Sequence, residues 1–220
     1  MGFFIDPYRF GTAAKVLTYQ TSAIDASNLT TYTFSTQSIG TEASDRRVIV
    51  GVVGGDSNRT VSTLTVGGVS ATFGARFQSN NATSEVWVAH VPTGTTGDVV
   101  VTWSGSQGRS AISVWSATGL TSDAIHASSG VFIGNSSPTD VSVDTLAGGF
   151  VVFVVYRSYI AGIAGSLDYT TATKRYDNYI ESFTTVHSVA DATTTGGNRT
   201  IQYNDNGGTQ GNSPGLLVAF

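Results

Sequence analysis

The apolar positions of this chain come in short runs separated by clusters of small polar residues and glycine. Each run is rich in β-branched or aromatic side chains, and Gly, Asn, Ser, Thr or Pro fills each gap. Short strands spaced in this way are the sequence signature of a β-sandwich or a β-barrel. The runs of the central block are Arg46–Val53, Val61–Val66, Val69–Phe77, Glu85–Val91, Asp98–Trp103 and Ala111–Ala117. We therefore predict an all-β protein, an antiparallel β-sandwich of jelly-roll-like type with an extended N-terminal arm.

Two features of the pattern predict specific structure. Gly67 and Gly68 lie between two alternating runs, and a tight hairpin turn needs positive φ at its centre, so they predict a hairpin. Gly149–Tyr156 is apolar on both faces, which predicts a central strand buried from both sides. Val48–Val53 has the same character, and we predict that these two strands pair.

Strand patterns continue on both sides of the central block. Asn204–Gly215 and Ser22–Asn28 are predicted to be loops, and Arg157–Ala172 is the least regular stretch. We find neither a linker nor a repeat of fixed period, so one sandwich domain over residues 15–220 is predicted, preceded by an arm at residues 1–14. The further predicted strands are Lys15–Thr21, Thr31–Ser38, Ala124–Phe132, Asp140–Thr145, Thr173–Tyr179, Ser182–Ala190, Asn198–Tyr203 and Leu216–Phe220.

Composition and charge exclude several classes of function. The 220 residues include 26 Gly and no Cys, only 12% are charged, and the formal net charge is −4. Scattered Arg and an acidic balance offer no basic stripe for a phosphate backbone, so nucleic acid is not an expected partner. Without Cys there are neither disulfides nor thiolate metal sites. We therefore expect oligomerisation to supply the additional stability. No apolar run is long enough for a membrane span, and charged residues interrupt the N-terminus where a signal peptide needs an apolar core.

The N-terminal arm concentrates large apolar side chains without any strand or helix periodicity. Their burial would contribute on the order of 10 kcal/mol before the ordering entropy is subtracted. We predict that the arm docks into another subunit or a neighbouring protein; the alternative is that it packs on its own domain as an edge segment. The predicted partner-binding residues are Phe3, Phe4, Ile5, Tyr8, Arg9 and Phe10.

No motif in the chain carries catalytic chemistry convincingly. Gly211–Gly215 matches the G-x-S-x-G nucleophile elbow, but Pro214 lacks the backbone N–H that the oxyanion hole requires. The three histidines lie far apart in sequence; His90 shares a strand face with Val86 and Val88, so we expect a core or interface histidine. We predict no enzymatic activity, no catalytic or metal-binding residue and no cofactor. The alternatives kept open are a glycosidase using Glu85, Asp168, Asp177 or Glu181, and Ca²⁺ binding at Asp56–Asn58 or Asn204–Gly207.

Aromatic residues divide into a core set and a candidate contact set. Trp103 shares a face with Val99 and Val101, which predicts core packing. Several tyrosines fall in or beside irregular segments, where their rigid rings would suit contact with a glycan or a protein. The candidate contact residues are Tyr159, Tyr169, Tyr176 and Tyr179.

The residue sequences of several of these segments resemble a β-sandwich domain of tailed-phage and phage-derived particle proteins. They are Arg46–Val52, Leu64–Ala71, Val86–Gly105 and Ile112–Leu120, and Ile5–Gly11 is similar to short N-terminal arms of such virion proteins. The resemblance implies a jelly-roll-like structural subunit of a phage head or tail, such as a spike-base, decoration or fibre-associated protein. It implies other virion proteins as partners (capsid, portal, tail or spike subunits), a homo-oligomer, and location in the virion after synthesis in the host cytoplasm. The alternative is a carbohydrate-binding module or receptor-binding protein that recognises host surface polysaccharide.

Overall fold

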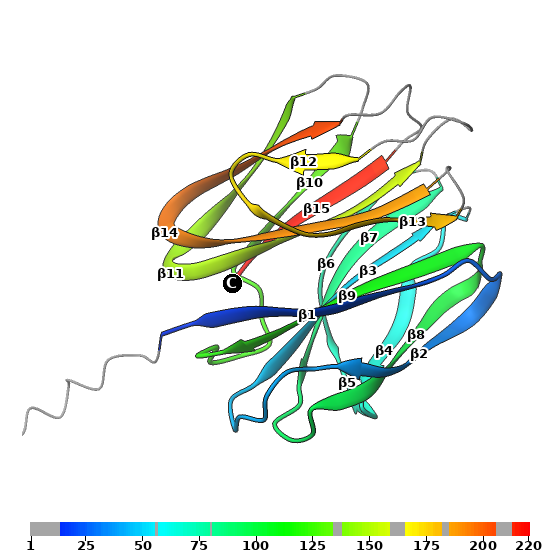
Figure 1. The fold of residues 1–220 in the computed structure, drawn as a ribbon, viewed down its shortest axis with the longest axis horizontal. Helices are drawn as coiled ribbons and strands as arrows, with labels where there is room; N and C mark the ends of the chain where they lie inside the picture. The colour runs from blue at the N-terminus through cyan, green and yellow to red at the C-terminus, as the bar shows by residue number, and fades with distance from the viewer. Residues whose placement is uncertain are drawn as a thin grey trace, which may run out of the picture.

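Fifteen β-strands in three sheets make up the regular structure of the described residues in a computed structural model of the chain (Figure 1). The structure describes residues 14–55, 57–79, 81–133, 138–158, 166–181, 185–205 and 213–220. Its strands pair antiparallel throughout. The prediction of an all-β protein with packed antiparallel sheets is confirmed. Within these ranges no helix is long and apolar enough to cross a bilayer.

The first two sheets are built from residues 16–118. Sheet A has the order β1-β9-β3-β7-β6, and sheet B has the order β2-β8-β4-β5. The strands of sheet A are β1 Val16–Asp25, β9 Arg109–Thr118, β3 Arg47–Gly55, β7 Ala82–His90 and β6 Thr72–Gln78. Those of sheet B are β2 Leu29–Ser38, β8 Thr96–Gln107, β4 Val61–Val66 and β5 Val69–Ser70.

Strand pairing in these two sheets is nested. The pairs β4–β5, β3–β7, β2–β8 and β1–β9 are all antiparallel, and each encloses the previous one in sequence. Successive pairs alternate between sheets B and A, so the chain resembles one long hairpin wrapped around its own core. At the tip of this hairpin, Gly67 and Gly68 have φ of 56° and 81°. The predicted Gly-Gly turn is therefore confirmed, because only glycine adopts two such angles without strain.

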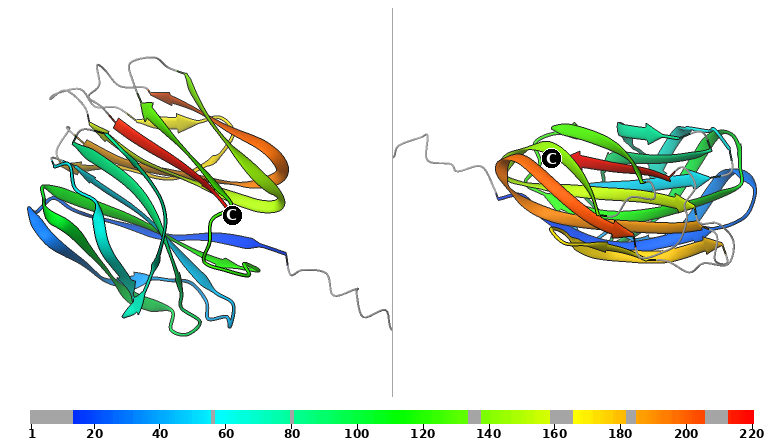
Figure 2. Two further views of the ribbon diagram at one scale, coloured as in Figure 1. Left: turned by 180° about the vertical axis from the view of Figure 1, so that it is seen from behind. Right: turned by 90° about the horizontal axis from the view of Figure 1, so that it is seen from above.

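Sheet C is built from residues 127–219 and packs on the other face of sheet A (Figures 1 and 2). Its strand order is β10-β15-β11-β14-β12, and β13 also pairs with β14. The strands are β10 Ala127–Ile133, β15 Ser213–Ala219, β11 Thr139–Ser158, β14 Thr185–Asp205, β12 Leu167–Tyr169 and β13 Thr173–Glu181.

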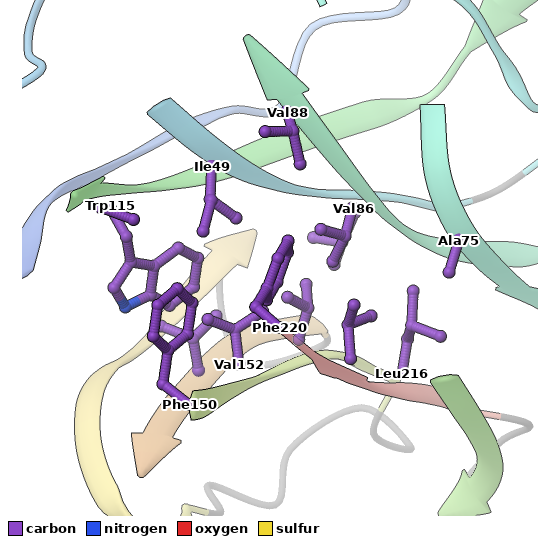
Figure 3. Packing of buried hydrophobic residues seen from close by; sticks show 14 of the residues in the cluster. Ile49, Ala75, Val86, Val88, Trp115, Phe150, Val152, Leu216 and Phe220 are labelled. Atoms are coloured by element: carbon purple, nitrogen blue, oxygen red, sulfur yellow. The ribbon is translucent and has the colours of Figure 1, made fainter. Parts of the chain in front are cut away.

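Sheet A is the middle layer, and its central strands β9, β3 and β7 are buried on both faces. Ile49 and Val53 of β3 pack toward sheet C in the core drawn in Figure 3, while Val48, Val50 and Val52 pack toward sheet B. Stacking on both sides explains why this strand is apolar at every position, as the sequence predicted.

The predicted pairing of Gly149–Tyr156 with Val48–Val53 is wrong. Val151–Val155 of β11 pair with β15 and β14, and β11 meets β3 face to face across the core. The approach is close, since a Cβ placed on Gly51 would lie 2.6 Å from Cγ2 of Val154. An apolar run indicates that a strand is buried on both faces. It does not indicate which neighbouring strand pairs with it through backbone hydrogen bonds.

Other corrections concern strand limits. The predicted strands Asp140–Thr145 and Gly149–Tyr156 are one strand, β11, with a register irregularity between Ala147 and Phe150. The predicted strand Val69–Phe77 divides at Ala71 between sheets B and A. Residues 22–25, predicted to begin a loop, continue β1.

The hairpin of β11 and β14 folds back on itself, and this creates a third core (Figure 1). Gly148 on β11 has a φ of 70°, and Gly196 and Gly197 on β14 have φ of 93° and 74°. Beyond this bend, Val141 and Ile201 lie over residues of the hairpin's other half, such as Phe153. Sheet C is thus curled, and the described residues form three hydrophobic clusters separated by sheet layers.

Candidate functional site

Three of the four candidate contact tyrosines, Tyr169, Tyr176 and Tyr179, lie on strands and not in irregular loops. Tyr169 ends β12; its hydroxyl is 2.8 Å from Oγ of Ser188, and its ring packs edge-on against Phe153. Tyr176 and Tyr179 lie on β13, and all three rings are half-buried. Tyr176 packs against the core between sheets A and C, so part of the area expected for a ligand is used inside the protein. The arm residues Phe3, Phe4, Ile5, Tyr8, Arg9 and Phe10, together with Tyr159, lie outside the described residues.

A chain of polar side chains crosses the seam between sheets A and C. The Tyr19 hydroxyl is 2.8 Å from Oγ of Ser22, which hydrogen-bonds Oγ of Ser113. That oxygen in turn lies 2.7 Å from Nε2 of His187 on β14. Desolvation by burial is the main cause that lowers the pKa of His187 to about 4, so the ring is neutral at pH 7.

The Ser113–His187 contact has the distance of a nucleophile and its general base. Both side chains are fully buried, between two packed sheets. A nucleophile must reach a reacting atom, and this oxygen is enclosed by protein. The pair therefore acts as a structural link between the sheets, and nothing in the sequence pointed to it.

Two further polar links join the same sheets. Asp191 of β14 accepts hydrogen bonds from Nε1 of Trp115 (2.8 Å) and from Nε and Nη2 of Arg175 (both 2.9 Å). Arg109 of β9 lies 2.7 Å from Glu181 and donates to Oγ1 of Thr185 at 3.0 Å. Asp191 and Thr185 are buried and must meet their partners with correct geometry, so these links help to specify how sheet C sits on sheet A.

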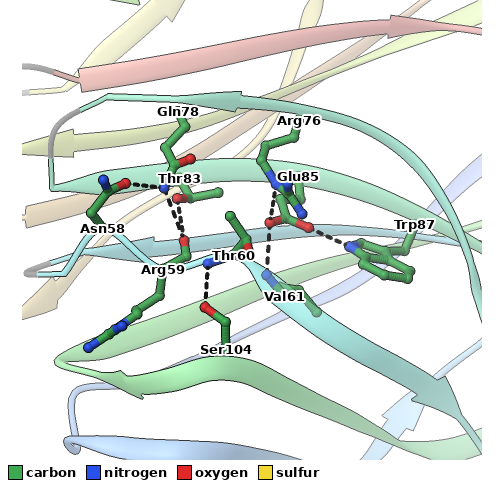
Figure 4. Close-up of polar contacts among 10 residues, drawn as sticks. All are labelled: Asn58, Arg59, Thr60, Val61, Arg76, Gln78, Thr83, Glu85, Trp87 and Ser104. Carbon is green, nitrogen blue, oxygen red and sulfur yellow. Dashed lines mark hydrogen bonds and ion pairs between the residues drawn. The ribbon is translucent and has the colours of Figure 1, made fainter.

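Glu85, a candidate glycosidase carboxylate, is fully buried within a network of its own (Figure 4). Its Oε1 accepts from Nε of Arg76 (2.7 Å) and from the backbone N–H of Val61 (2.9 Å). Its Oε2 accepts from Nε1 of Trp87 at 2.8 Å. Three donors hold the carboxylate in place, and the contact with Val61 ties sheet A to sheet B. The geometry assigns Glu85 to the scaffold.

Two of the other candidate carboxylates, Asp168 and Asp177, lie beside a lysine on β13, whereas Glu181 pairs with Arg109. Nζ of Lys174 lies 2.8 Å from Asp168 and 3.6 Å from Asp177. Burial is the main cause that raises the pKa of Asp177, although the backbone N–H of Leu167 and Lys174 act against it. An ammonium group between two carboxylates neutralises them in part, and it occupies the position where a glycosidase would hold its substrate.

The expectation that His90 is a core histidine is wrong. His90 is exposed at the end of β7, where Nε2 lies 2.9 Å from the carbonyl oxygen of Ser44, and it is not a core residue. The core histidine is His187.

The described residues contain no group of three His, Asp or Glu placed to hold a metal ion. Asp56, Asn206 and Gly207, which belong to the candidate Ca²⁺ turns, lie outside them. Ser213 of the G-x-S-x-G match is buried within β15, a strand and not an elbow.

Arg46 is a buried charged residue whose role the sequence pattern did not indicate. Its side chain is fully buried, and it donates to four carbonyl oxygens, those of Gly40, Val91, Thr93 and Gly94, at 2.5–2.8 Å. A guanidinium group can satisfy several carbonyls at once because its donors form a rigid fork. Arg46 thereby fixes two loops at the end of sheet A where β1 begins.

No protein family model, curated protein or solved structure matches this chain.

Proposed function

We propose that this protein is a non-enzymatic structural subunit of a tailed-phage virion or a phage-like particle. It acts as a spike-base, decoration or fibre-associated protein that docks through its N-terminal arm and displays its stacked sheets on the particle surface. In this proposal its partners are capsid, portal, tail or spike subunits together with further copies of itself, and it reaches the virion from the host cytoplasm.

The observation that carries the proposal is the nested pairing of residues 16–118. Sheet orders β1-β9-β3-β7 and β2-β8-β4-β5 match a hairpin rolled into two sheets, which is the jelly roll found in viral capsid proteins. We infer that these two sheets form a jelly roll, with β6 as an additional edge strand and sheet C as an added layer. A fold shared by many proteins does not decide function, so the argument also needs the sites.

The buried polar groups support a structural role. Side chains with the chemistry of a catalyst, such as Glu85, Ser113 and His187, are enclosed and used to tie one sheet to the next. The resulting stack has matched hydrogen bonds in each seam, which favours one rigid arrangement. Such rigidity suits a subunit that must hold its shape on a particle.

The arm supports docking because it precedes an edge strand. Among the described strands β1 lies at the edge of sheet A, paired with β9, and the carbonyl of Ala14 packs against Gly119 just before β1 begins. Thirteen residues precede Ala14, and a segment of that length can span up to about 45 Å if extended. Five large apolar side chains on that length would supply the contact area.

Deletion of residues 2–11 tests the proposal. We expect the truncated protein to keep its strand content and melting temperature while it fails to enter particles when supplied during their production. Replacement of Phe3, Phe4 and Phe10 by serine should have the same effect at full length, whereas the matched polar change Thr12→Ser should not. Incorporation of the deletion variant at the normal level would overturn the proposal.

A further inference from the structure

A hollow of about 260 Å³ with both polar and apolar lining lies at the end of sheet A where β1 begins. Val16 and Thr18 of β1 face it, alternating with Leu17 and Tyr19, which pack into the core on the other side. Thr41, Glu42, Ala43 and Arg46 also line it. We call it the β1–β9 hollow. Its polar lining comes from Thr18, Gln20, Thr41, Glu42, Ser116 and Thr118.

The walls of the β1–β9 hollow are held in place by hydrogen bonds. The Gln20 amide donates to Oγ of Ser116 at 2.9 Å and accepts from Oγ of Ser38 at 3.1 Å. Arg46, which lines the hollow, is held by its four carbonyl partners. Because these groups are already ordered, a ligand would lose less free energy in fixing them.

The charges of the hollow are opposite and close. Arg46 contributes one buried positive charge, and Glu42 contributes a carboxylate that accepts the backbone N–H of Gly94 at 2.5 Å. Burial lowers the pKa of Arg46, and the nearby Glu42 charge acts in the opposite direction. With one charge of each sign, the hollow attracts neither cations nor anions strongly. Its hydroxyl, amide and carboxylate groups instead suit a neutral ligand with many hydroxyl groups.

We propose that the β1–β9 hollow binds one neutral sugar residue of a surface glycan. Hydroxyls of Thr18, Thr41 and Thr118 both donate and accept hydrogen bonds, as sugar hydroxyls do, and Glu42 accepts from them. The volume is below the ~300–1,000 Å³ typical of pockets for drug-sized ligands, so it holds a single ring. This site differs from the candidate tyrosines, and it goes beyond the structural role, which does not require it.

An NMR titration of the full-length protein tests this assignment. The probes are the methyl glycosides of glucose, galactose and N-acetylglucosamine, with glucuronate as the charged comparison. We expect at least one neutral sugar to shift the backbone amide signals of residues 16–20, 41–46 and 116–118 with a Kd of about 1–10 mM. Thr18→Trp, which fills the hollow, should weaken that binding roughly tenfold or more. Thr33→Trp, at an exposed position of β2, is the matched control and should leave it unchanged.

Two results would overturn the proposal. One is the absence of shifts at the hollow with every neutral sugar up to about 50 mM, which would saturate a millimolar site. The other is shifts confined to another surface, for example around Tyr169 and Tyr176. Neither result bears on docking through the arm, so the two proposals fail independently.

The Glu42→Gln variant tests the charge argument with nearly unchanged shape. In the wild-type protein glucuronate should bind more weakly than its neutral counterpart, because its carboxylate meets that of Glu42. The substitution should reduce this difference by roughly threefold or more, and a difference that stays the same would contradict the assignment of Glu42 to the site.

Discussion

The buried histidine of the A–C seam makes the stability of this protein depend on pH in a defined direction. His187 has a pKa of about 4 in the folded protein and about 6.5 when exposed. Between these values the unfolded chain binds more protons than the folded chain. The contribution of His187 is therefore complete above about pH 6.5, falls as the pH is lowered, and is fully lost below about pH 4.

The magnitude follows from the size of the shift. A difference of one pKa unit corresponds to about 1.4 kcal/mol, so a lowering from 6.5 to about 4 corresponds to about 3 kcal/mol. This is a large share of a typical folding free energy of about 5–15 kcal/mol. Most of the loss should fall between pH 6 and pH 4.

Urea unfolding at a series of pH values measures this effect. The free energy of unfolding of the wild-type protein should fall more steeply between pH 6.5 and pH 4 than that of His187→Gln, by about 3 kcal/mol over the range. His90→Gln, at an exposed histidine on β7, is the matched control and should follow the wild-type curve. In a direct NMR titration of the folded protein, the ring signals of His187 should not shift above about pH 5. Ring signals that titrate near pH 6.5, or identical curves for wild type and His187→Gln, would refute the reasoning.

Two further predictions concern the contacts of sheet A. Glu85→Ala should lower the free energy of unfolding by about 3 kcal/mol, because it leaves Nε1 of Trp87 and the N–H of Val61 without their acceptor. A loss below about 1 kcal/mol in urea unfolding would contradict this prediction. Gly51→Ala should cost about 1–3 kcal/mol, because its Cβ would lie 2.6 Å from Val154, and the double variant with Val154→Ala should lose less than the sum of the two single changes. Strict additivity in thermal or urea unfolding would show that the two sites do not touch.

Local pattern was sufficient to predict most strands. The limits of β4 match the predicted run Val61–Val66, and the turn at Gly67–Gly68 has the predicted angles. These features depend on neighbours in sequence, such as alternation along a strand and the freedom of glycine at positive φ. The core position of Trp103 was predictable for the same reason, since it alternates with Val99 and Val101.

The polar groups of the interior could not be predicted in this way. His90 and His187 both follow apolar strand residues, yet the first is exposed and the second is buried. The difference arises because His187, on β14 of sheet C, faces Ser113 of sheet A across the seam, whereas His90 is exposed at the end of β7. Arg46 and Glu85 are likewise buried charges whose partners lie on other strands or loops, with Val91 and Val61 among them. Their roles depend on residues distant in sequence.

The sequence by itself determined that this protein is made of antiparallel β-sheets, where most strands lie, and which strands are buried on both faces. Alternation, β-branched content and turn residues are local properties, and they act before any tertiary contact forms. Only the tertiary structure decided that β11 pairs with β14 and β15 and faces β3, that β11 and β14 bend into a third core, and that Arg46 lines the β1–β9 hollow. Many apolar strands in one chain are almost equivalent as hydrogen-bond partners, and the choice among them depends on how whole sheets stack and which buried polar groups then meet.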